Sequence, residues 1–151
     1  MAEVLTSKKD VTTMKLVIDW ATLASTGQGT ISAGIWLEVE TTGFPERHWS
    51  DLAVAVTRAF AEATDKVAAG PGASEQVYFL DGPFSVTLSL INGGQLVLRG
   101  FRREQDFGWE GSVDLADWRE HLHAVSRQLL DECAAKGWRD ADIVALESWL
   151  R

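Results

Sequence analysis

The sequence of 151 residues contains little cysteine and no long apolar run. Cys133 is the single cysteine, so no disulfide can form within the chain and no cluster of thiolates can bind a metal. The first ten residues, MAEVLTSKKD, lack the apolar stretch of a secretory signal, and the apolar runs elsewhere are too short to cross a bilayer. We therefore expect a cytoplasmic protein with no membrane segment.

Basic residues are also scarce. The chain has 14 lysines and arginines against 22 aspartates and glutamates, which gives a net charge of −8. Residues 104–151 hold five of the basic and eleven of the acidic side chains, so a charge of −6 falls on the last third of the chain. A surface of this sign repels phosphate backbones and attracts basic proteins. We expect no binding to nucleic acid, and we expect a protein partner to be basic.

Catalytic motifs are missing as well. The sequence has no G-x-S-x-G elbow, and Cys133 lies on the apolar stripe of a predicted helix, where a thiol is normally inert. Asp117 and His121 share a helix face and could bind a metal only if a third ligand came from elsewhere; a solvated helix pair is the commoner outcome. The sequence therefore indicates no cofactor, no metal and no enzymatic activity.

Alternating residues predict most of the strands. Residues 75–102 predict three antiparallel strands, because Phe84, Val86, Leu88 and Leu90 alternate with small hydroxyl residues between two turn sequences, Asp-Gly-Pro and Asn-Gly-Gly. Residues 13–23 and 30–40 show the same period of two and predict an N-terminal hairpin.

The period changes to 3.6 in three other segments. Apolar residues from Trp49 onward predict a helix capped by Ser50 and ending near residue 70; a second helix begins near Asp114, and Asp140 caps a short last helix. Residues 103–113 show no period and predict a loop. Together these segments predict a single α+β domain over residues 1–151. Its five-stranded antiparallel sheet has helices mainly on one face, in the order β-β-α-β-β-β-α-α.

Two surfaces are candidates for binding. The sheet face turned away from the helices is expected to display Val17, Trp36, Val97 and Phe101 among polar residues, for a partner, the last helix or a second copy of the chain to cover. The loop near residue 107 places aromatic residues among acids, although its tryptophan could instead tuck under the loop. The residues expected to contact a partner are Trp36, Glu38, Asp106, Trp109 and Glu110.

Two motifs resemble a diffuse group of small bacterial immunity proteins, which neutralise toxins. In that group a strand leads through Phe-Pro and Trp-x-Asp into a helix, and an aromatic-x-Asp-Gly-Pro-aromatic turn follows. The matching stretches here are GFPERHWSDLAVAVTRAF (43–60) and VYFLDGPFSVTL (77–88), with matches at Phe44, Pro45, Trp49, Asp51, Phe79, Asp81, Gly82, Pro83 and Phe84. The likeness covers residues 36–98 and leaves the acidic C-terminal third unmatched.

The first functional hypothesis is a non-enzymatic protein-binding module, an immunity-type inhibitor that occludes a bacterial toxin and is steered to it by charge. An alternative is a small-molecule-binding domain or enzyme, with a pocket between the first helix and the sheet onto which His48, Trp49 and Asp81 converge. A further alternative is a structural subunit that self-associates through the bare sheet face. A monomer and a homodimer are both compatible with the sequence.

Overall fold

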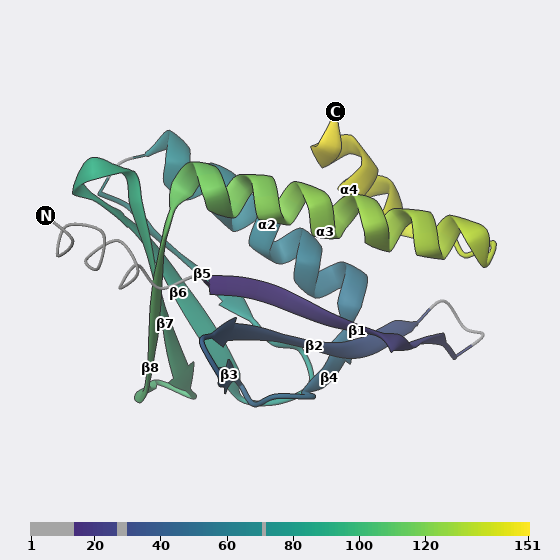
Figure 1. Ribbon diagram of the computed structural model, residues 1–151, viewed down its shortest axis with the longest axis horizontal. Helices are drawn as coiled ribbons and strands as arrows, with labels where there is room; N and C mark the ends of the chain where they lie inside the picture. The colour runs from purple at the N-terminus through teal and green to yellow at the C-terminus, as the bar shows by residue number, and fades with distance from the viewer. Residues whose placement is uncertain (1–13, 27–29, 71) are drawn as a thin grey trace, which may run out of the picture.

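The computed structural model describes residues 14–26, 30–70 and 72–151, and it is an α+β fold with two antiparallel sheets. Figure 1 shows one sheet, built from β1 to β4, running across the lower part of the molecule, while the other, built from β5 to β8, stands at its side. Within these residues, none of the helices is long and apolar enough to span a membrane.

The first sheet is organised around β2 (Ile31–Val39). This strand pairs on one side with β1 (Met14–Ser25), as the predicted N-terminal hairpin requires. On its other side it pairs with two short strands, β3 (Thr42–Phe44) and β4 (Ser50–Leu52). Residues 45–49 leave the sheet between these two strands and return to it, and Ile35 donates its backbone N–H to the carbonyl of Trp49 at 2.6 Å.

The second sheet has the order β5-β6-β7-β8. The three strands predicted from alternation are β5 (Ser74–Tyr78), β6 (Phe84–Ile91) and β7 (Gln95–Arg102), with the short 3-10 helix η1 (Asn92–Gly94) in the second turn. The fourth strand is β8 (Gln105–Asp114), which pairs with β7.

The prediction of one five-stranded sheet is wrong, because the strands before and after the first helix pair only within their own group. A period of two shows which residues share a face, but it does not show which strands are neighbours. The face expected to be continuous is therefore divided: Val17 and Trp36 belong to the first sheet, Val97 and Phe101 to the second.

The loop predicted over residues 103–113 is also wrong, since most of this segment is β8. Its inward positions are Trp109, Gly111 and Val113, all buried. A Cβ at Gly111 would lie 2.6 Å from Cγ2 of Val39 and 2.9 Å from Sδ of Met14, so only glycine fits there. Because glycine occupies an inward position, the sequence of this segment does not show the alternation of apolar and polar residues that predicts a strand.

Three helices complete the described part of the chain: α2 (Ala53–Ala69), α3 (Leu115–Ala135) and α4 (Ala141–Leu150). The prediction that Ser50 caps α2 is wrong, because Ser50 lies in β4. Leu52 occupies the N-cap position of α2, and its side chain makes no capping hydrogen bond. Asp140 caps α4 as predicted, accepting the backbone N–H of Ile143 at 2.8 Å.

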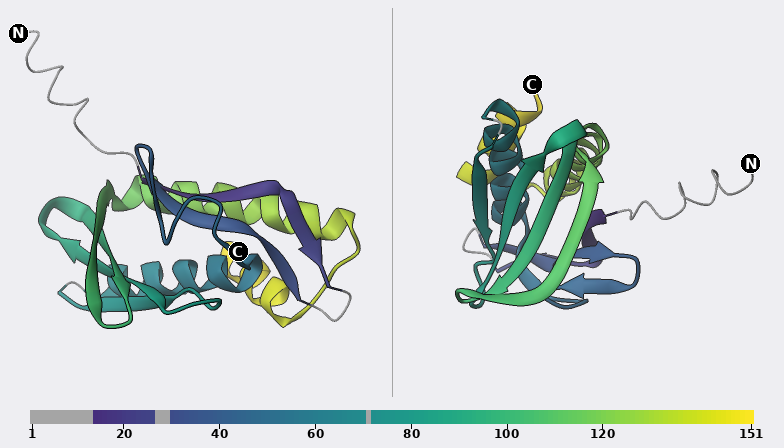
Figure 2. Two further views of the ribbon diagram at one scale, coloured as in Figure 1. Left: turned by 90° about the horizontal axis from the view of Figure 1, so that it is seen from below. Right: turned by 90° about the vertical axis from the view of Figure 1, so that its left-hand side faces the viewer.

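The helices join the two sheets. α2 packs on β2 of the first sheet and on β5 and β6 of the second, and α3 packs on β1 and β8 (Figure 2). α4 rests on both helices, and Asp65 of α2 accepts hydrogen bonds from Arg119 of α3 and Trp149 of α4. One cluster of buried apolar residues consequently runs through both sheets and all three helices.

Candidate functional site

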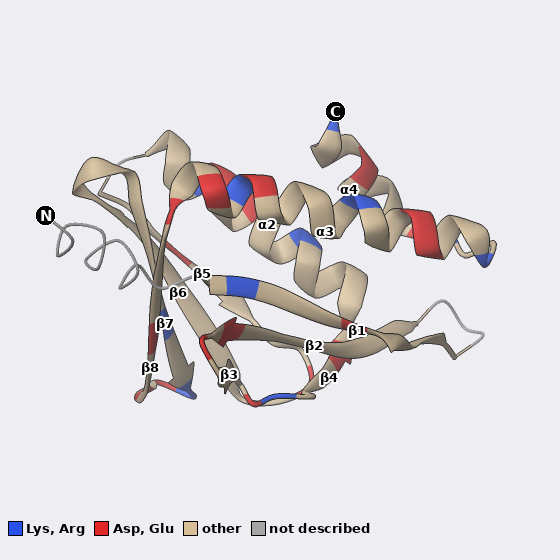
Figure 3. Cartoon of the chain, in the orientation of Figure 1, with Lys and Arg blue, Asp and Glu red and all other residues tan. Residues whose placement is uncertain are grey.

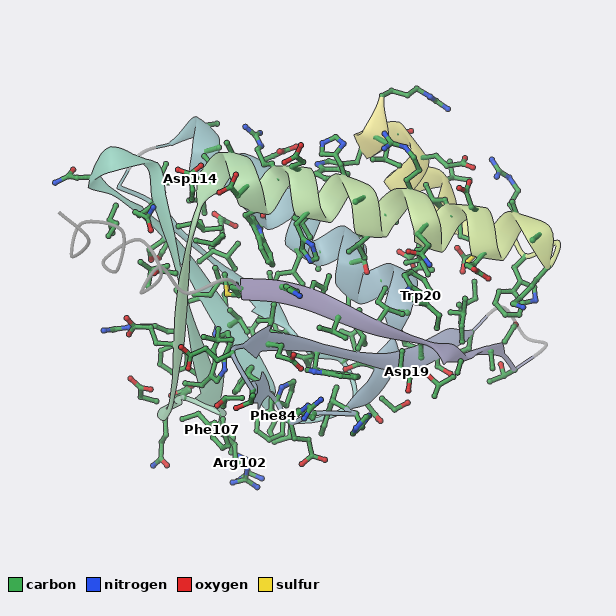
Figure 4. The ribbon with its side chains drawn as sticks, in the orientation of Figure 1. Asp19, Trp20, Phe84, Arg102, Phe107 and Asp114 are labelled. Carbon is green, nitrogen blue, oxygen red and sulfur yellow. The ribbon has the colours of Figure 1, made fainter. Side chains whose placement is uncertain are left out.

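Three connections that are distant in sequence meet at one corner of the molecule. They are the β3–β4 connection (45–49), the β5–β6 turn (79–83) and the end of the β7–β8 hairpin (102–108). The rings of Trp49 and Phe107 both contact Phe84, the residue of β6 that directly follows the β5–β6 turn. Figure 4 labels Phe84, Arg102 and Phe107 at this corner, below the β7 and β8 strands.

A buried carboxylate ties the first two connections together. Asp51 is 3% exposed. Its carboxylate accepts three hydrogen bonds: from Nε1 of Trp49 at 3.0 Å, from the backbone N–H of Leu52 at 2.7 Å, and from the backbone N–H of Asp81 at 3.2 Å. The Trp-x-Asp sequence at the start of the helix therefore holds the Asp-Gly-Pro turn in place.

A close approach of the backbone strengthens this link. A Cβ on Gly82 would lie 2.8 Å from Cη2 of Trp49, so the indole packs directly on the glycine. The indole of Trp49 also packs edge to face on the ring of Phe84, with the two ring centroids 5.3 Å apart and the ring planes at 80°. The two motifs that resemble the immunity proteins thus form one structural unit in this chain.

Phe44 lies at the centre of the aromatic rings. It is fully buried, it stacks on Trp109 at 5.4 Å, and it meets Phe84 and Phe107 edge to face at 5.7 and 5.5 Å. A Cβ on Gly100 would lie 2.6 Å from its ring, which explains the glycine on β7. Edge-to-face pairs of this kind contribute about 0.5–1.5 kcal/mol each beyond the area that they bury.

Exposure increases outward from Phe44. Phe84 and Trp49 are half-buried, and Phe107 is 48% exposed although it touches both Phe44 and Phe84. Arg102 lies opposite Phe84 across the β6–β7 ladder, is exposed, and forms no ion pair with a described residue. We call the surface made by Trp49, Phe84, Arg102 and Phe107 the aromatic corner.

Both signs of charge surround the aromatic corner. Figure 3 shows acidic and basic residues side by side at the end of the β7–β8 hairpin. Asp106 accepts the backbone N–H of Gly108 at 2.8 Å, and Glu110 pairs with Arg99 at 3.0 Å. As expected, Asp106 and Glu110 are exposed. These acidic side chains lie near the exposed ring of Phe107 and leave it accessible.

The expected exposure of Trp36 is wrong. It is 4% exposed, its ring lies 5.1 Å from that of His48, and its Nε1 donates to Glu38 at 3.0 Å. Glu38 is half-buried and also pairs with Arg47 at 3.4 Å. The β3–β4 connection folds over the outer face of β2 and covers the tryptophan, an arrangement that strand periodicity cannot reveal.

The expected exposure of Trp109 is wrong as well. It is 6% exposed and points inward from β8 against Phe44, and its buried Nε1 has no hydrogen-bond partner among the described residues. The β7–β8 register passes from Gly100–Trp109 to Phe101–Asp106, which leaves Phe107 and Gly108 as extra residues in a bulge. Gly108 has a φ of +85°. Phe107 is therefore the exposed aromatic residue of this segment, and the glycine between two aromatic residues was the signal for the bulge.

Asp81, which was expected to line a pocket between the first helix and the sheet, instead lines a hollow to which no residue of α2 contributes. The hollow of about 250 Å³ is lined by Asp81 together with Ser32, Ser50, Asp51, Leu52 and Leu80. Trp49 and Asp81 both donate to Asp51, but His48 lies against Trp36 instead, so the three expected residues do not converge on one pocket. The carboxylate of Asp51 already accepts three N–H groups in this hollow.

The remaining candidates for chemistry are occupied by structural contacts. Nε2 of His121 lies 2.8 Å from the backbone nitrogen of Leu16 and 3.1 Å from its carbonyl oxygen. Burial raises the pKa of the Cys133 thiol to about 11, so the group stays protonated. In the part of the chain that the structure describes, no three histidine, cysteine or carboxylate side chains gather as ligands for a metal.

Comparisons with protein-family models, with curated proteins and with solved structures find no match to this chain. The features of this chain that point to a function are the aromatic corner and the net charge of −8.

Proposed function

We propose that this protein is a non-enzymatic protein-binding module that docks on a basic partner through the aromatic corner. The observation that carries the proposal is Phe107, which is 48% exposed while its ring is held against Phe44 and Phe84. A large exposed ring fixed by buried neighbours is the kind of anchor that dominates binding energy in protein interfaces.

The construction of the corner favours tight docking. Binding loses free energy when mobile side chains and loops become ordered. Here the three connections are braced by the bonds to Asp51 and by the ring contacts, so little ordering remains to be done. Arg102 adds a guanidinium that forms no ion pair with a described carboxylate, and arginine and aromatic residues are enriched in protein interfaces.

The charge of the whole chain supports a basic partner. A net charge of −8 attracts a positively charged protein over distances longer than any contact and raises the rate of association. In this proposal the rings of the aromatic corner anchor the partner. The exposed carboxylates of Asp106 and Glu110, on the same strand as Phe107, orient it. Trp36 and Trp109 act from beneath as support, because both are buried.

The finer proposal is that the protein is an immunity-type inhibitor whose partner is a bacterial toxin domain. Its support is the resemblance described above together with the place of the matching residues. Trp49, Asp51, Asp81, Gly82 and Phe84 are the residues that brace or form the aromatic corner. A nuclease toxin would meet the requirement for a basic surface, since it must bind phosphates.

The test is affinity capture from cells that carry the gene, followed by reconstitution with the purified partner. Three baits are compared: the wild-type chain, Phe107→Ala and Ile91→Ala. Ile91 is a matched control, because it is 53% exposed at the opposite end of β6. We expect a basic protein that binds the wild type and Ile91→Ala equally, and we expect Phe107→Ala to bind it about 30-fold more weakly, as for an anchor worth about 2 kcal/mol.

Equal binding of all three baits would refute the aromatic corner as the docking surface. Sedimentation of the free protein gives an independent check. A concentration-dependent dimer that Phe107→Ala disrupts would mean that the corner serves self-association.

If the captured protein inhibits growth when expressed alone and is harmless when expressed with this chain, the immunity proposal is supported. A partner that is harmless by itself contradicts it.

A further inference from the structure

The strand β5 forms one edge of the second sheet. In the right-hand view of Figure 2 the strands of this sheet lie side by side, and β5 is the outermost strand on one side. β6 pairs with one side of β5, and no described strand pairs with the other side. Ser74, Gln76 and Tyr78 of β5 are exposed. The free side of β5 is therefore accessible to another extended chain.

The ladder to β6 shows which backbone groups are free. Phe79, directly after β5, donates its backbone N–H to the carbonyl of Phe84 at 3.0 Å. In an antiparallel pair such bonds recur at every second residue, so Glu75 and Val77 also bond to β6. The backbone N–H and C=O groups of the alternate residues point to the free side, where no described residue bonds to them: Ser74, Gln76 and Tyr78.

The side chains of β5 leave these backbone groups open. Nε2 of Gln76 donates to Oγ of Ser85, on β6, at 3.0 Å, and the hydroxyl of Tyr78 donates to Oε1 of Gln76 at 2.9 Å. The bond to Ser85 directs the amide of Gln76 toward β6 and away from the free side. A strand that docks on β5 therefore need not break either bond.

The other sheet edges that the structure describes carry protection that β5 lacks. β1 has an irregular register, and the backbone of Leu16 is bonded to His121 of α3. β3 and β4 are three residues long, and β8 has the bulge at Phe107 and Gly108. Short strands, bulges, lysines and prolines are the usual protection of a sheet edge. β5 pairs with β6 without a register shift and contains neither lysine nor proline, so it is left open to pairing.

The charge of this edge indicates what can occupy it. Residues 74–83 contain two acids, Glu75 and Asp81, and no basic residue, and Glu75 forms no ion pair with a described residue. A second copy of the chain would bring the same acids and a further net charge of −8, which opposes self-association. A basic strand would instead place cations beside Glu75, and cross-strand pairs of opposite charge are stabilising.

We propose that β5 adds an extended strand of the basic partner to the second sheet, a proposal that rests on the function proposed above. Backbone hydrogen bonds hold such a strand, as they do where other peptides extend an exposed sheet edge. β5 runs directly into the β5–β6 turn at the aromatic corner, and Tyr78 and Leu80 are 59% and 56% exposed along this path. One partner can therefore contact the edge and the corner together.

The experiment titrates the full-length, nitrogen-15-labelled protein with a basic peptide, acetyl-Lys-Val-Lys-Val-Lys-Val-amide, and follows the backbone amide resonances. We expect saturable shifts that are largest at Ser74, Gln76 and Tyr78, with slower hydrogen exchange at the same amides, because their N–H groups gain acceptors. Two matched peptides are compared: proline for each valine keeps the charge but prevents strand pairing, and glutamate for each lysine reverses the charge. We expect both to bind about tenfold more weakly or less.

The variant Gln76→Pro tests the edge itself. The N–H of Gln76 faces the free side, so proline removes one donor without removing a bond of the ladder to β6. We expect the dissociation constant of the basic peptide to rise about tenfold, while the urea midpoint stays close to that of the wild type. Gln76→Ala is the control, because it also removes the side chain but keeps the N–H, and it should bind like the wild type.

Shifts absent from β5, equal binding of the three peptides, or binding that persists in folded Gln76→Pro would overturn the proposal. If Gln76→Pro does not fold, the three peptides on the wild-type protein decide the question. A dimer in sedimentation that the basic peptide dissociates would also overturn it, because the edge would then belong to a second copy of the chain.

This titration needs no partner, so it is independent of the capture experiment. Partner binding that depends on Phe107 but not on the N–H of Gln76 would leave the docking proposal intact and remove the added strand. A peptide-binding edge in a protein whose partner ignores Phe107 would instead remove the aromatic corner and keep the edge.

Discussion

At the residue scale, one carboxylate organises the candidate site. Asp51 accepts N–H groups from its own strand, from the indole of Trp49 and from the turn at Asp81, and it is almost completely buried. Trp-x-Asp and Asp-Gly-Pro are recognisable in the sequence as a helix start and a turn. The sequence could not show that they bind each other, because the 30 residues from Asp51 to Asp81 contain a whole helix.

We expect Asp51→Ala to lower the free energy of unfolding by about 3 kcal/mol, since three N–H donors lose their carboxylate acceptor. Urea denaturation measures this loss. The control is Asp106→Ala, which removes an exposed carboxylate from the same corner and should change the free energy of unfolding by less than about 1 kcal/mol. Equal losses in the two variants would contradict the bracing role of Asp51.

The close packing of Phe44 on β7 leads to a second prediction. Gly100→Ala places a Cβ within 2.6–2.8 Å of three ring carbons of Phe44, so the ring must move. We expect a loss of about 1–3 kcal/mol, the usual cost of overpacking. The same urea titration measures it, with Ser112→Ala on β8 as a control that changes a half-exposed position. An unchanged midpoint for Gly100→Ala would show that the ring has room to yield.

At the element scale, alternation and the 3.6 period located three helices and five of the strands, and the turns between neighbouring strands predicted the β1–β2 and β5–β6–β7 pairings. The division of these strands between two sheets could not be read from the sequence. The short strands β3 and β4 contain three residues each, too few for a period, and β8 carries glycine at an inward position. The helix-to-sheet contacts were equally hidden. His121 of α3 bonds to the backbone of Leu16, at the edge of β1, where sequence alone indicated a solvated helix pair with Asp117.

The burial of His121 makes stability depend on pH. Burial lowers the pKa of His121 below its ordinary value of 6.5, while the bond to Leu16 opposes that shift and Lys15 adds to it. The unfolded chain therefore binds a proton at this residue at higher pH than the native protein does. Its contribution to stability is present above pH 6.5 and is lost as the pH falls through the unfolded pKa toward the lower folded one.

We expect the free energy of unfolding to fall between about pH 7 and pH 5, and to fall less steeply in His121→Gln, which cannot take up a proton. Urea titrations at each pH measure the slope. Gln128→Ala, an exposed position on the same helix that cannot titrate, is the control and should keep the wild-type slope. If His121→Gln and the wild type have the same slope, the burial of His121 does not couple stability to protonation.

At the scale of the whole molecule, the two sheets share one core. Buried residues from β1, β2, β6, β7 and all three helices form a single cluster, and α2 packs on both sheets. The sequence predicted a single α+β domain, and its apolar residues were enough to indicate a core. It could not divide the strands between two sheets, because that division depends on contacts across α2.

We expect unfolding in urea to be one cooperative transition, because neither sheet has a separate core to keep it folded. Tryptophan fluorescence and far-ultraviolet circular dichroism should give the same midpoint and slope. Separate midpoints for the two signals would mean that the sheets unfold independently and that the shared core couples them weakly.

The β3–β4 connection (45–49) affects how readily the protein aggregates at high concentration. It divides the edge of the first sheet that pairs with β2 into two short strands, β3 and β4, each three residues long, and it covers part of the adjacent sheet face. A growing fibril needs a long, straight row of free amide and carbonyl groups onto which the next molecule can add. This edge offers none, so the chain resists stacking into amyloid from that side.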